Sequence, residues 1–413
     1  MDMKKLVNLR MGLMIAAVVL AVILALTSCS GGTNGKENGT QTEGDTASVT
    51  EAEAKPGDTE TLIIGLSAPL SGELADFGTA YVNGASLACA EINGSGGIVL
   101  DGKPYTLLLS AKDDGGTDAS GAVNSLIAEK AAFIIGPATS DALGSVEKLC
   151  NNEEVLLVSP SASFGKIDDR SDFVFRMGLS GDDIAEGAVR YMAAKNHKTA
   201  AVIYTESLYS RELRQEFRDE CGDNGISIVC EISCEESAAD YSGMFDEIAA
   251  AKADFVFLPL YAHSAANAVK ELSAVGYMGD IIGGDGLEGL SGKLTETYAG
   301  SIYFMSGFNP ESKEQNVTSF METYTTQHGT PMSVSALAYD VVKAVVSAVE
   351  AAESDDPDQI RAALSKPEFA YSGLTGNLNF DEEGNGEHRK IEVIQLVMGK
   401  DGYTEKWVES VDI

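Results

Sequence analysis

The sequence predicts an α/β protein made of two doubly wound, Rossmann-like lobes, and three observations support this fold class. From residue 61 onward, short β-type apolar runs alternate with helical patterns of about ten to sixteen residues, which is typical of βαβ units in a parallel sheet. Several strand-like runs, such as IIGLSAPL and DFVFLPL, are continuously apolar, as parallel strands buried on both faces are. This part of the chain, about 350 residues, exceeds the size at which single cores stop growing, so two lobes are expected.

The expected elements follow one another in a regular order. Strands are expected at 61–67, 105–111, 132–135, 155–159, 199–204, 227–232, 254–260, 280–282 and 301–305. Helices between them are expected at 78–92, 118–129, 140–150, 183–194, 208–221, 241–250, 262–275 and 287–297. The strand-like run FVFRMGLS at 173–180 precedes a new helix, and after residue 306 the pattern changes to helices at 313–328, 334–352 and 358–364, followed by terminal strands.

The N-terminus has the order of parts of a secretory signal. Lys4, Lys5 and Arg10 precede an apolar run over 11–26, which ends at Leu-Thr-Ser before Cys29. This ending resembles the bacterial lipobox, in which signal peptidase cuts before the cysteine and its thiol carries diacylglycerol. The alternative, an uncleaved membrane anchor, is disfavoured because the run is shorter than the roughly 20 residues that a spanning helix needs. We therefore expect a signal peptide over 1–28, lipidation of Cys29, and anchoring on the extracytoplasmic face of the cell membrane.

A flexible acidic linker is expected over 29–60. It consists mainly of Gly, Thr, Glu, Asn, Ala and Ser and has almost no large apolar residue, so it cannot bury enough surface to offset its ordering entropy. A flexible coil of this length has an end-to-end distance of roughly 30 Å. The linker can therefore hold a globular body clear of a membrane.

Charge and motifs exclude several classes of function. The formal net charge of −34 disfavours nucleic acid and anionic lipid headgroups as ligands. The sequence contains no P-loop, no GxSxG elbow and no HExxH motif, so no cofactor, metal or catalytic residue is expected. The acidic run from Asp381 resembles a calcium loop, but β-type runs flank it where an EF-hand needs helices, and an acidic hairpin turn is expected instead.

The chain contains six cysteines. If Cys29 is lipidated, five remain, and an odd number cannot pair completely within one chain. Cys89 and Cys150 lie in helical apolar patterns and are expected to be buried thiols. The sequence leaves open a disulfide bond among the other three, whose spacing matches no zinc site: Cys221, Cys230 and Cys234.

Ligands of doubly wound sheets bind beyond the carboxyl ends of the strands, so the loops at those ends are the candidate site. The loops APLSGELADFG, GPATS, SPSAS and YTESLYS are rich in hydroxyls and poor in catalytic pairs. Ser140 begins an expected helix, where free N–H groups favour a carboxylate, although a simple N-cap is the alternative. Across the cleft, Asp285 follows a strand and can pair with an ammonium group, while Tyr209 and Tyr261 supply flat walls. Taken singly, each of these three is better explained as an ordinary residue, Asp285 as a turn residue and the two tyrosines as partial core.

Together, these segments resemble the type I periplasmic binding proteins of branched-chain amino-acid transport. The resemblance runs from about residue 61 to the C-terminus, through IGLSAPLSGELADFG, AEINGSGGI, GPATS, SPSAS, DFVFLPLYAHSA and GNLNFDEEGN. It implies a first lobe of 61–179 plus 309–388, a second lobe of 180–308 plus 389–413, and a hinge that the chain crosses three times. The implied mechanism is closure of the lobes on a ligand.

The resemblance also assigns the binding residues. Ser140 takes the position whose hydroxyl binds the ligand carboxylate, and Ser161 and Ser163 complete that site, with Ser163 in place of the more usual Thr. Asp285 takes the position of the ammonium-binding acid, where some members have the longer Glu. The aromatic positions fall on Phe77, Tyr209 and Tyr261.

The implied function is an extracytoplasmic substrate-binding lipoprotein of an ABC importer. Its expected partners are a free amino acid, branched-chain or similarly apolar, and the permease subunits, and the protein is expected to be a monomer and not an enzyme. A ligand-sensing ectodomain of the same fold and a surface-tethered enzyme are the alternatives. The sequence does not choose among the amino acids, nor between a host with one membrane and a host with two.

Overall fold

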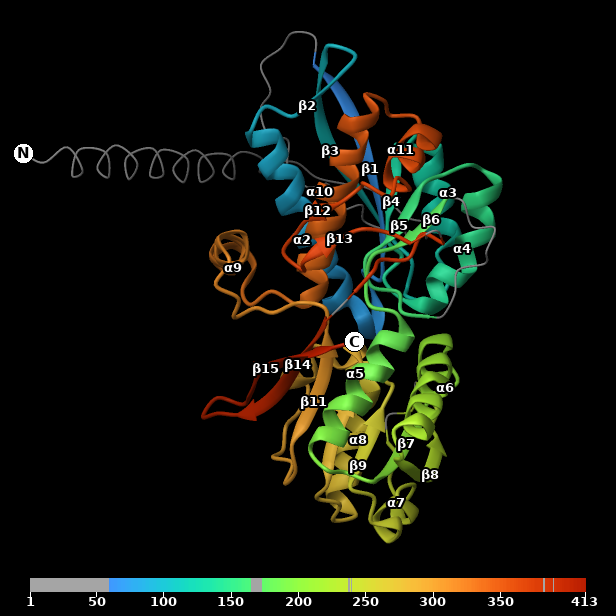
Figure 1. The fold of residues 1–413 in the computed structure, drawn as a ribbon, viewed down its shortest axis with the longest axis vertical. Helices are drawn as coiled ribbons and strands as arrows, with labels where there is room; N and C mark the ends of the chain where they lie inside the picture. The colour runs from blue at the N-terminus through green and yellow to red at the C-terminus, as the bar shows by residue number, and fades with distance from the viewer. Residues whose placement is uncertain (1–58, 165–172, 237, 239, 382, 389) are drawn as a thin grey trace, which may run out of the picture. The chain divides into compact units, whose positions relative to one another are not determined.

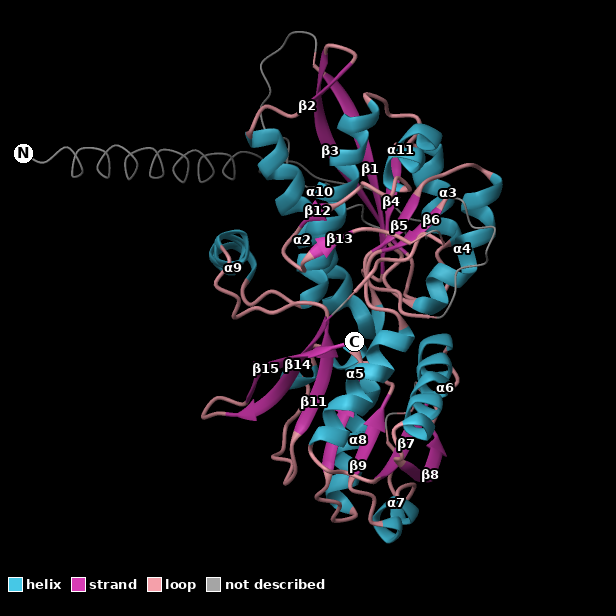
Figure 2. Ribbon diagram, viewed as in Figure 1, coloured by secondary structure: helices cyan, strands magenta, loops and turns pink. Residues whose placement is uncertain are grey.

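The computed structural model describes residues 59–164, 173–236, 238, 240–381, 383–388 and 390–413. These residues fall within one compact unit, in which helices flank two sheets (Figures 1 and 2). The expected signal peptide over 1–28, the lipidated Cys29 and nearly all of the linker lie outside the described residues.

The first sheet has six strands in the order β2-β3-β1-β4-β5-β6. The strands are β1 (Glu60–Ala68), β2 (Ile98–Leu100), β3 (Lys103–Asp113), β4 (Phe133–Ile135), β5 (Leu157–Ser159) and β6 (Val174–Arg176). All neighbours are parallel except β2 and β3. The pattern missed β2, because three residues are too few to show alternation. It forms through a two-residue hairpin in which Asp101 and Gly102 both have positive φ.

Helices cover both faces of this sheet. They are α2 (Ala75–Gly94), α3 (Ser120–Ala128), α4 (Ser140–Asn152), α10 (Ser333–Ala352) and α11 (Pro357–Leu364), and a further helix, α9 (Gln315–His328), packs on α2 and α10. Helices α2, α10 and α11 share one core with the sheet, and α3 and α4 share another. Helices α2 and α10 approach so closely at Gly84 that a Cβ atom there would lie 2.0 Å from the Ser335 carbonyl oxygen.

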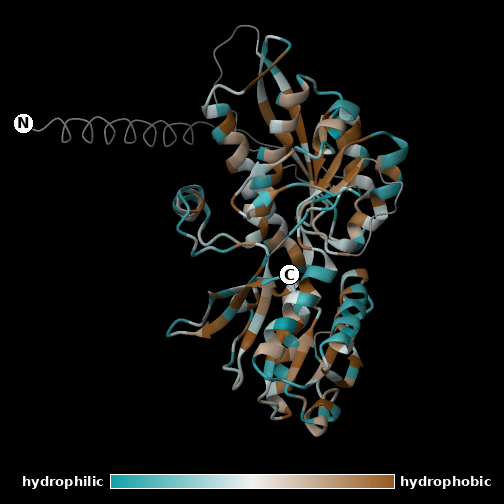
Figure 3. Ribbon diagram, in the orientation of Figure 1, coloured by the Kyte–Doolittle hydropathy of each residue, from teal (hydrophilic) through white to brown (hydrophobic). Residues whose placement is uncertain are grey.

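The second sheet has seven strands in the order β15-β14-β11-β10-β9-β7-β8. Five are parallel: β7 (Thr199–Tyr204), β8 (Ser227–Ser233), β9 (Phe255–Leu258), β10 (Asp280–Gly283) and β11 (Ile302–Ser306). The other two, β14 (Lys390–Met398) and β15 (Tyr403–Asp412), form an antiparallel edge. Helices α5 (Gly181–Ala194) and α6 (Leu208–Asp223) cover one face, and α7 (Asp246–Ala251) and α8 (Ala262–Ala274) cover the other. Hydrophobic residues concentrate on the strands of both sheets (Figure 3).

The chain passes between the sheets three times. It leaves the first sheet after β6, returns after β11 to build α9, α10 and α11, and crosses again before β14. The short hairpin of β12 (Tyr371–Ser372) and β13 (Asn377–Leu378) precedes the last crossing. The acidic turn from Asp381 is closed by an antiparallel bridge between Phe380 and Gly386, so the expected hairpin turn is confirmed.

Two expected helices are wrong or misplaced. The helix expected at 287–297 does not form, and the segment holds two short 3₁₀ turns, η2 (Asp285–Leu287) and η3 (Leu290–Gly292). Gly289 between them has φ +80, a left-handed conformation that ends helical hydrogen bonding. The helix expected from residue 241 begins only at Asp246, because Gly243 adopts φ +77.

Two further features concern the described residues. The five cysteines among them are free thiols, so the disulfide that the sequence left open is absent from this part of the chain.

No single described helix is long and apolar enough to cross a membrane. One pair, α9 and α10, passes that test together by length and composition, and it bends by 115° at the break.

Candidate ligand-binding site

The loops after β4 and β5 present the first lobe's serines. Gly136 has φ +97, and a Cβ atom there would lie 2.1 Å from the Ser67 carbonyl oxygen, so glycine lets this loop pass close against β1. Thr139 then caps α4, since its hydroxyl accepts the Ala142 N–H at 3.3 Å. Ser140 is therefore the first residue of the helix, and its alternative interpretation as the N-cap is wrong.

The three serines are buried, and each makes hydrogen bonds to neighbouring groups. The Ser140 hydroxyl accepts the Phe164 N–H at 3.1 Å, so its own proton can be donated to a ligand. The Ser161 hydroxyl donates to the Ala138 carbonyl at 2.8 Å and hydrogen-bonds the Tyr81 hydroxyl. Ser163 lies 3.2 Å from the Ser161 carbonyl. These hydroxyls sit beside the N-terminus of α4, whose free N–H groups favour an anionic group.

The second lobe contributes an acid and two stacked aromatic rings. The Tyr209 hydroxyl donates to Asp285 Oδ1 at 3.0 Å and accepts the Gly286 N–H at 3.0 Å. The rings of Tyr209 and Tyr261 stack with centroids 4.9 Å apart. Tyr209 thus fixes the Asp285 carboxylate and the turn that carries it.

The local electrostatics favour a cation beside Asp285. Burial raises the pKa of the Asp285 carboxyl to about 6, although the hydrogen bonds from Tyr209 and Ser163 oppose this shift. Burial also raises the pKa of Tyr261, and the nearby carboxylates of Asp141 and Glu236 raise it further. An ammonium group placed here would relieve the penalty of the buried carboxylate.

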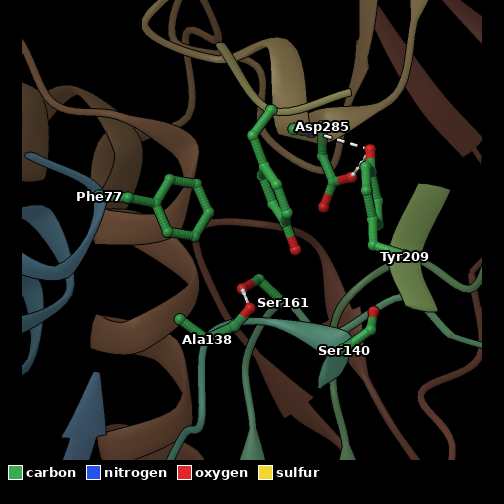
Figure 4. Close-up of a pocket in the computed structure, with 8 residues that line it drawn as sticks. Phe77, Ala138, Ser140, Ser161, Tyr209 and Asp285 are labelled. Atoms are coloured by element: carbon green, nitrogen blue, oxygen red, sulfur yellow. Dashed lines mark hydrogen bonds between the residues drawn. The ribbon is translucent and has the colours of Figure 1, made fainter. Parts of the chain in front are cut away.

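The two groups of residues meet in one small cavity. The Ser163 hydroxyl lies 3.3 Å from Asp285 Oδ2, and the Leu208 N–H donates to Asp141 Oδ1 at 2.9 Å, so both contacts join the lobes. The cavity has a free volume of about 10 Å³, room for about one water-sized sphere. Figure 4 shows serines on one side of it and Asp285 with Tyr209 on the other. Its lining residues are Phe77, Ala138, Ser140, Ser161, Tyr209, Tyr261, Asp285 and Gly286.

The structure brings the seven residues singled out in the sequence together. Six of them line the cavity, and the seventh, Ser163, reaches it through its contact with Asp285. Sequence reasoning missed Tyr81, which holds Ser161, as well as the backbone of Ala138 and Gly286. Tyr81 lies four residues after the expected aromatic Phe77, with ring centroids 5.9 Å apart, so helical spacing was a usable signal. The sequence gives no comparable signal for the backbone of Ala138 and Gly286.

Comparison with known proteins identifies the family. The profile described as periplasmic binding protein matches residues 61–402. The chain belongs to the periplasmic binding protein family. A Leu/Ile/Val-binding protein of Rhizobium johnstonii is 25% identical over 344 residues, which cover 82% of this chain and 92% of that protein. The predicted membership of the branched-chain amino-acid group is confirmed.

Solved structures agree with this family and fold. The branched-chain amino acid transporter substrate binding protein of Streptococcus pneumoniae, in complex with isoleucine, has a TM-score of 0.74 and 26% identity, and covers 84% of this chain and 99% of its own. A leucine binding protein of Thermotoga maritima has a TM-score of 0.75 at 20% identity, covers 85% of this chain and 99% of its own, and shows the same fold. The predicted two-lobed α/β fold is confirmed.

Family membership settles the class of activity. Periplasmic binding proteins act outside the cytoplasm and bind substrates for transporters. This periplasmic binding protein is therefore a substrate-binding protein and not an enzyme.

Proposed function

We propose that this protein captures an α-amino acid with an apolar side chain and delivers it to the permease of an ABC importer. The carrying observation is the direct approach of an acid on one lobe to hydroxyls on the other, with Ser163 Oγ 3.3 Å from Asp285 Oδ2. In the complex, the ligand ammonium pairs with Asp285, and the ligand carboxylate accepts from the Ser140 hydroxyl, the Ser161 backbone N–H and the N-terminus of α4. This arrangement complements the two charges of an amino-acid zwitterion.

Apolar surfaces around these polar groups select the side chain. Phe77, Ala138 and the faces of Tyr209 and Tyr261 line the cavity beside Asp285. Such walls favour leucine, isoleucine, valine or a ligand of similar polarity, because a polar side chain would lose its hydration without gaining partners. Relatives named for Leu/Ile/Val binding and for isoleucine support this class of ligand.

Capture proceeds by hinge closure of two lobes, 61–179 plus 309–388 and 180–308 plus 389–413. The strand membership of the two sheets supports these boundaries, since β1 to β6 lie in the first lobe and β7 to β11, β14 and β15 lie in the second. A free volume of about 10 Å³ is too small for an amino acid, so the lobes must part to admit one. A ligand that contacts both lobes then shifts the population toward the closed form that the permease reads.

The protein acts as a monomer held at the membrane by a lipid on Cys29. The linker over 29–60, which its composition predicts to be flexible, lets the lobes close and dock while the binding protein stays within reach of its permease. Replacing Cys29 by alanine should release the protein from the membrane fraction and abolish incorporation of radiolabelled fatty acid. Retention of the variant in the membrane fraction would contradict lipid anchoring and leave the binding proposal untouched.

Isothermal titration calorimetry with matched ligands tests the binding proposal. Leucine should bind the wild type, whereas the keto acid analogue, which lacks the ammonium group, and leucinamide, which lacks the carboxylate, should each bind at least about 100-fold more weakly. Asp285→Asn should abolish leucine binding. If sugars or purines bind and no free amino acid does, the proposal is wrong even though the fold stands.

A further inference from the structure

The turn that carries Asp285 also carries a second acid, which reaches the other lobe. Glu288 follows η2, and its N–H donates to the Asp285 carbonyl at 3.0 Å, so both side chains belong to one short turn. The Glu288 carboxylate accepts the Ser333 hydroxyl at 2.7 Å and also the Ser333 N–H. Glu288 and Ser333 are both buried.

Ser333 is the first residue of α10, so Glu288 acts as the cap of that helix. The first N–H groups of a helix have no partner within it, and a side-chain oxygen that accepts from them acts as a cap. The residue at the N-cap position of α10 is Met332, whose side chain makes no capping hydrogen bond. The cap therefore comes from the second lobe, through hydrogen bonds from the Ser333 N–H and hydroxyl to Glu288.

Strand β15 of the second lobe holds this turn in place by hydrogen bonds. Glu405 on β15 accepts the Gly289 N–H at 3.1 Å and the Ser291 hydroxyl at 2.9 Å. The turn thus moves with the second lobe, and Glu288 can reach α10 only while the lobes are together.

We propose that Glu288 is an interlobe latch, a positioning residue that strengthens substrate binding by capping α10 when the lobes close, without contacting the substrate. The inference rests on the proposed capture by hinge closure. Because Asp285 and Glu288 share one turn, pairing of Asp285 with a ligand and capping of α10 by Glu288 form in the same movement. Each contact therefore favours the other.

The protonation state of the Glu288 carboxyl suggests glutamine as the conservative replacement. Burial, reinforced by the nearby Glu405, raises the pKa of Glu288 to about 8, so glutamine resembles the neutral form of this side chain in shape and in its acceptor oxygen. Glu288→Gln should therefore keep the latch, whereas Glu288→Ala should lose it.

The first test is a double-mutant cycle read by leucine affinity. Ser333→Pro removes both Ser333 donors, and proline suits the first position of a helix after the extended Met332 (φ −81, ψ 158). Glu288→Ala and Ser333→Pro should each weaken leucine binding by about five- to thirty-fold, as the loss of a helix cap does. The double variant should bind no more than about twofold more weakly than the worse single variant, because the second change removes nothing further.

Two controls separate the latch from mere support of the Asp285 turn. Glu288→Gln and Glu296→Ala, the latter at an exposed position of the same lobe, should stay within about twofold of the wild type. If Glu288→Ala leaves the affinity unchanged, or if the two single losses multiply in the double variant, the latch is wrong.

Hydrogen exchange of the Ser333 amide gives a second readout. In the leucine-saturated protein, whose lobes are closed, Glu288→Ala should speed this exchange, since the amide has no acceptor within its helix, and Glu288→Gln should not. If the wild type binds leucine but exchange in leucine-saturated Glu288→Ala is unchanged, the latch is wrong and the proposed ligand stands. If the wild type binds no amino acid, the proposed function fails, and the latch, which rests on it, fails with it.

Discussion

Replacing Asp285 by asparagine should stabilise the unliganded protein while it abolishes amino-acid binding. Burial raises the pKa of the Asp285 carboxyl from 3.8 to about 6, so the folded protein holds this proton more tightly than the unfolded chain does. Between these two pH values the folded state binds more protons, and the free energy of unfolding falls as the pH rises. Above pH 6 the loss is complete and amounts to about 3 kcal/mol, at 1.36 kcal/mol per pH unit.

Asparagine keeps the shape of the side chain and removes the charge. The Tyr209 hydroxyl, 3.0 Å from Oδ1, can still donate to the asparagine oxygen, and the new amide group would face Ser163, 3.3 Å from Oδ2. At pH 7 we expect a gain of about 2–3 kcal/mol, which for about 350 residues raises the unfolding midpoint by about 3–4 °C. The gain should shrink as the pH falls from 7 toward 4, because the wild-type carboxyl becomes neutral.

Thermal unfolding followed by circular dichroism at several pH values measures this effect. The matched control is Asp401→Asn, which removes a charge from the exposed turn between β14 and β15 and should leave the midpoint unchanged. Leucine affinity of Asp285→Asn should fall by about 100-fold or more, because the ligand ammonium would be buried without its partner. An Asp285→Asn midpoint at or below the wild type at pH 7, or retained leucine affinity, would refute the reasoning.

Tyr209→Phe should weaken leucine binding by about five- to thirty-fold, because it removes the hydroxyl that orients Asp285; calorimetry checks this, and unchanged affinity contradicts it. Leucine affinity of the wild type should fall as the pH drops below 6, by up to about tenfold per pH unit, since a protonated Asp285 cannot pair with an ammonium group. Calorimetry across this range should show that slope, and a flat profile would exclude Asp285 as the ammonium partner. Gly84→Ala should lower the free energy of unfolding by about 1–3 kcal/mol, because its Cβ would lie 2.0 Å from the Ser335 carbonyl oxygen. Gly94→Ala, with nothing within 4 Å of the added atom, should not, and denaturant titration compares the two.

Local periodicity was a reliable guide where burial is continuous along the chain. The strand expected at 199–204 coincides with β7, and the helix expected at 140–150 begins at the same residue as α4. Parallel strands buried on both faces and helices with one apolar face impose patterns that a short window reveals. The same reasoning fails over 287–297, where apolar spacing suggests a helix but Gly289 in a left-handed conformation ends one.

The sequence by itself determined the α/β class, the loops at the strand ends and, through the family resemblance, the seven residues that the structure gathers around one cavity. Only the tertiary structure decided which backbone groups join them and that Glu288 caps α10. Glu288 and Ser333 lie 45 positions apart and meet across two lobes. A contact of this kind depends on how the two lobes pack against each other, and local propensity and periodicity carry no information about it.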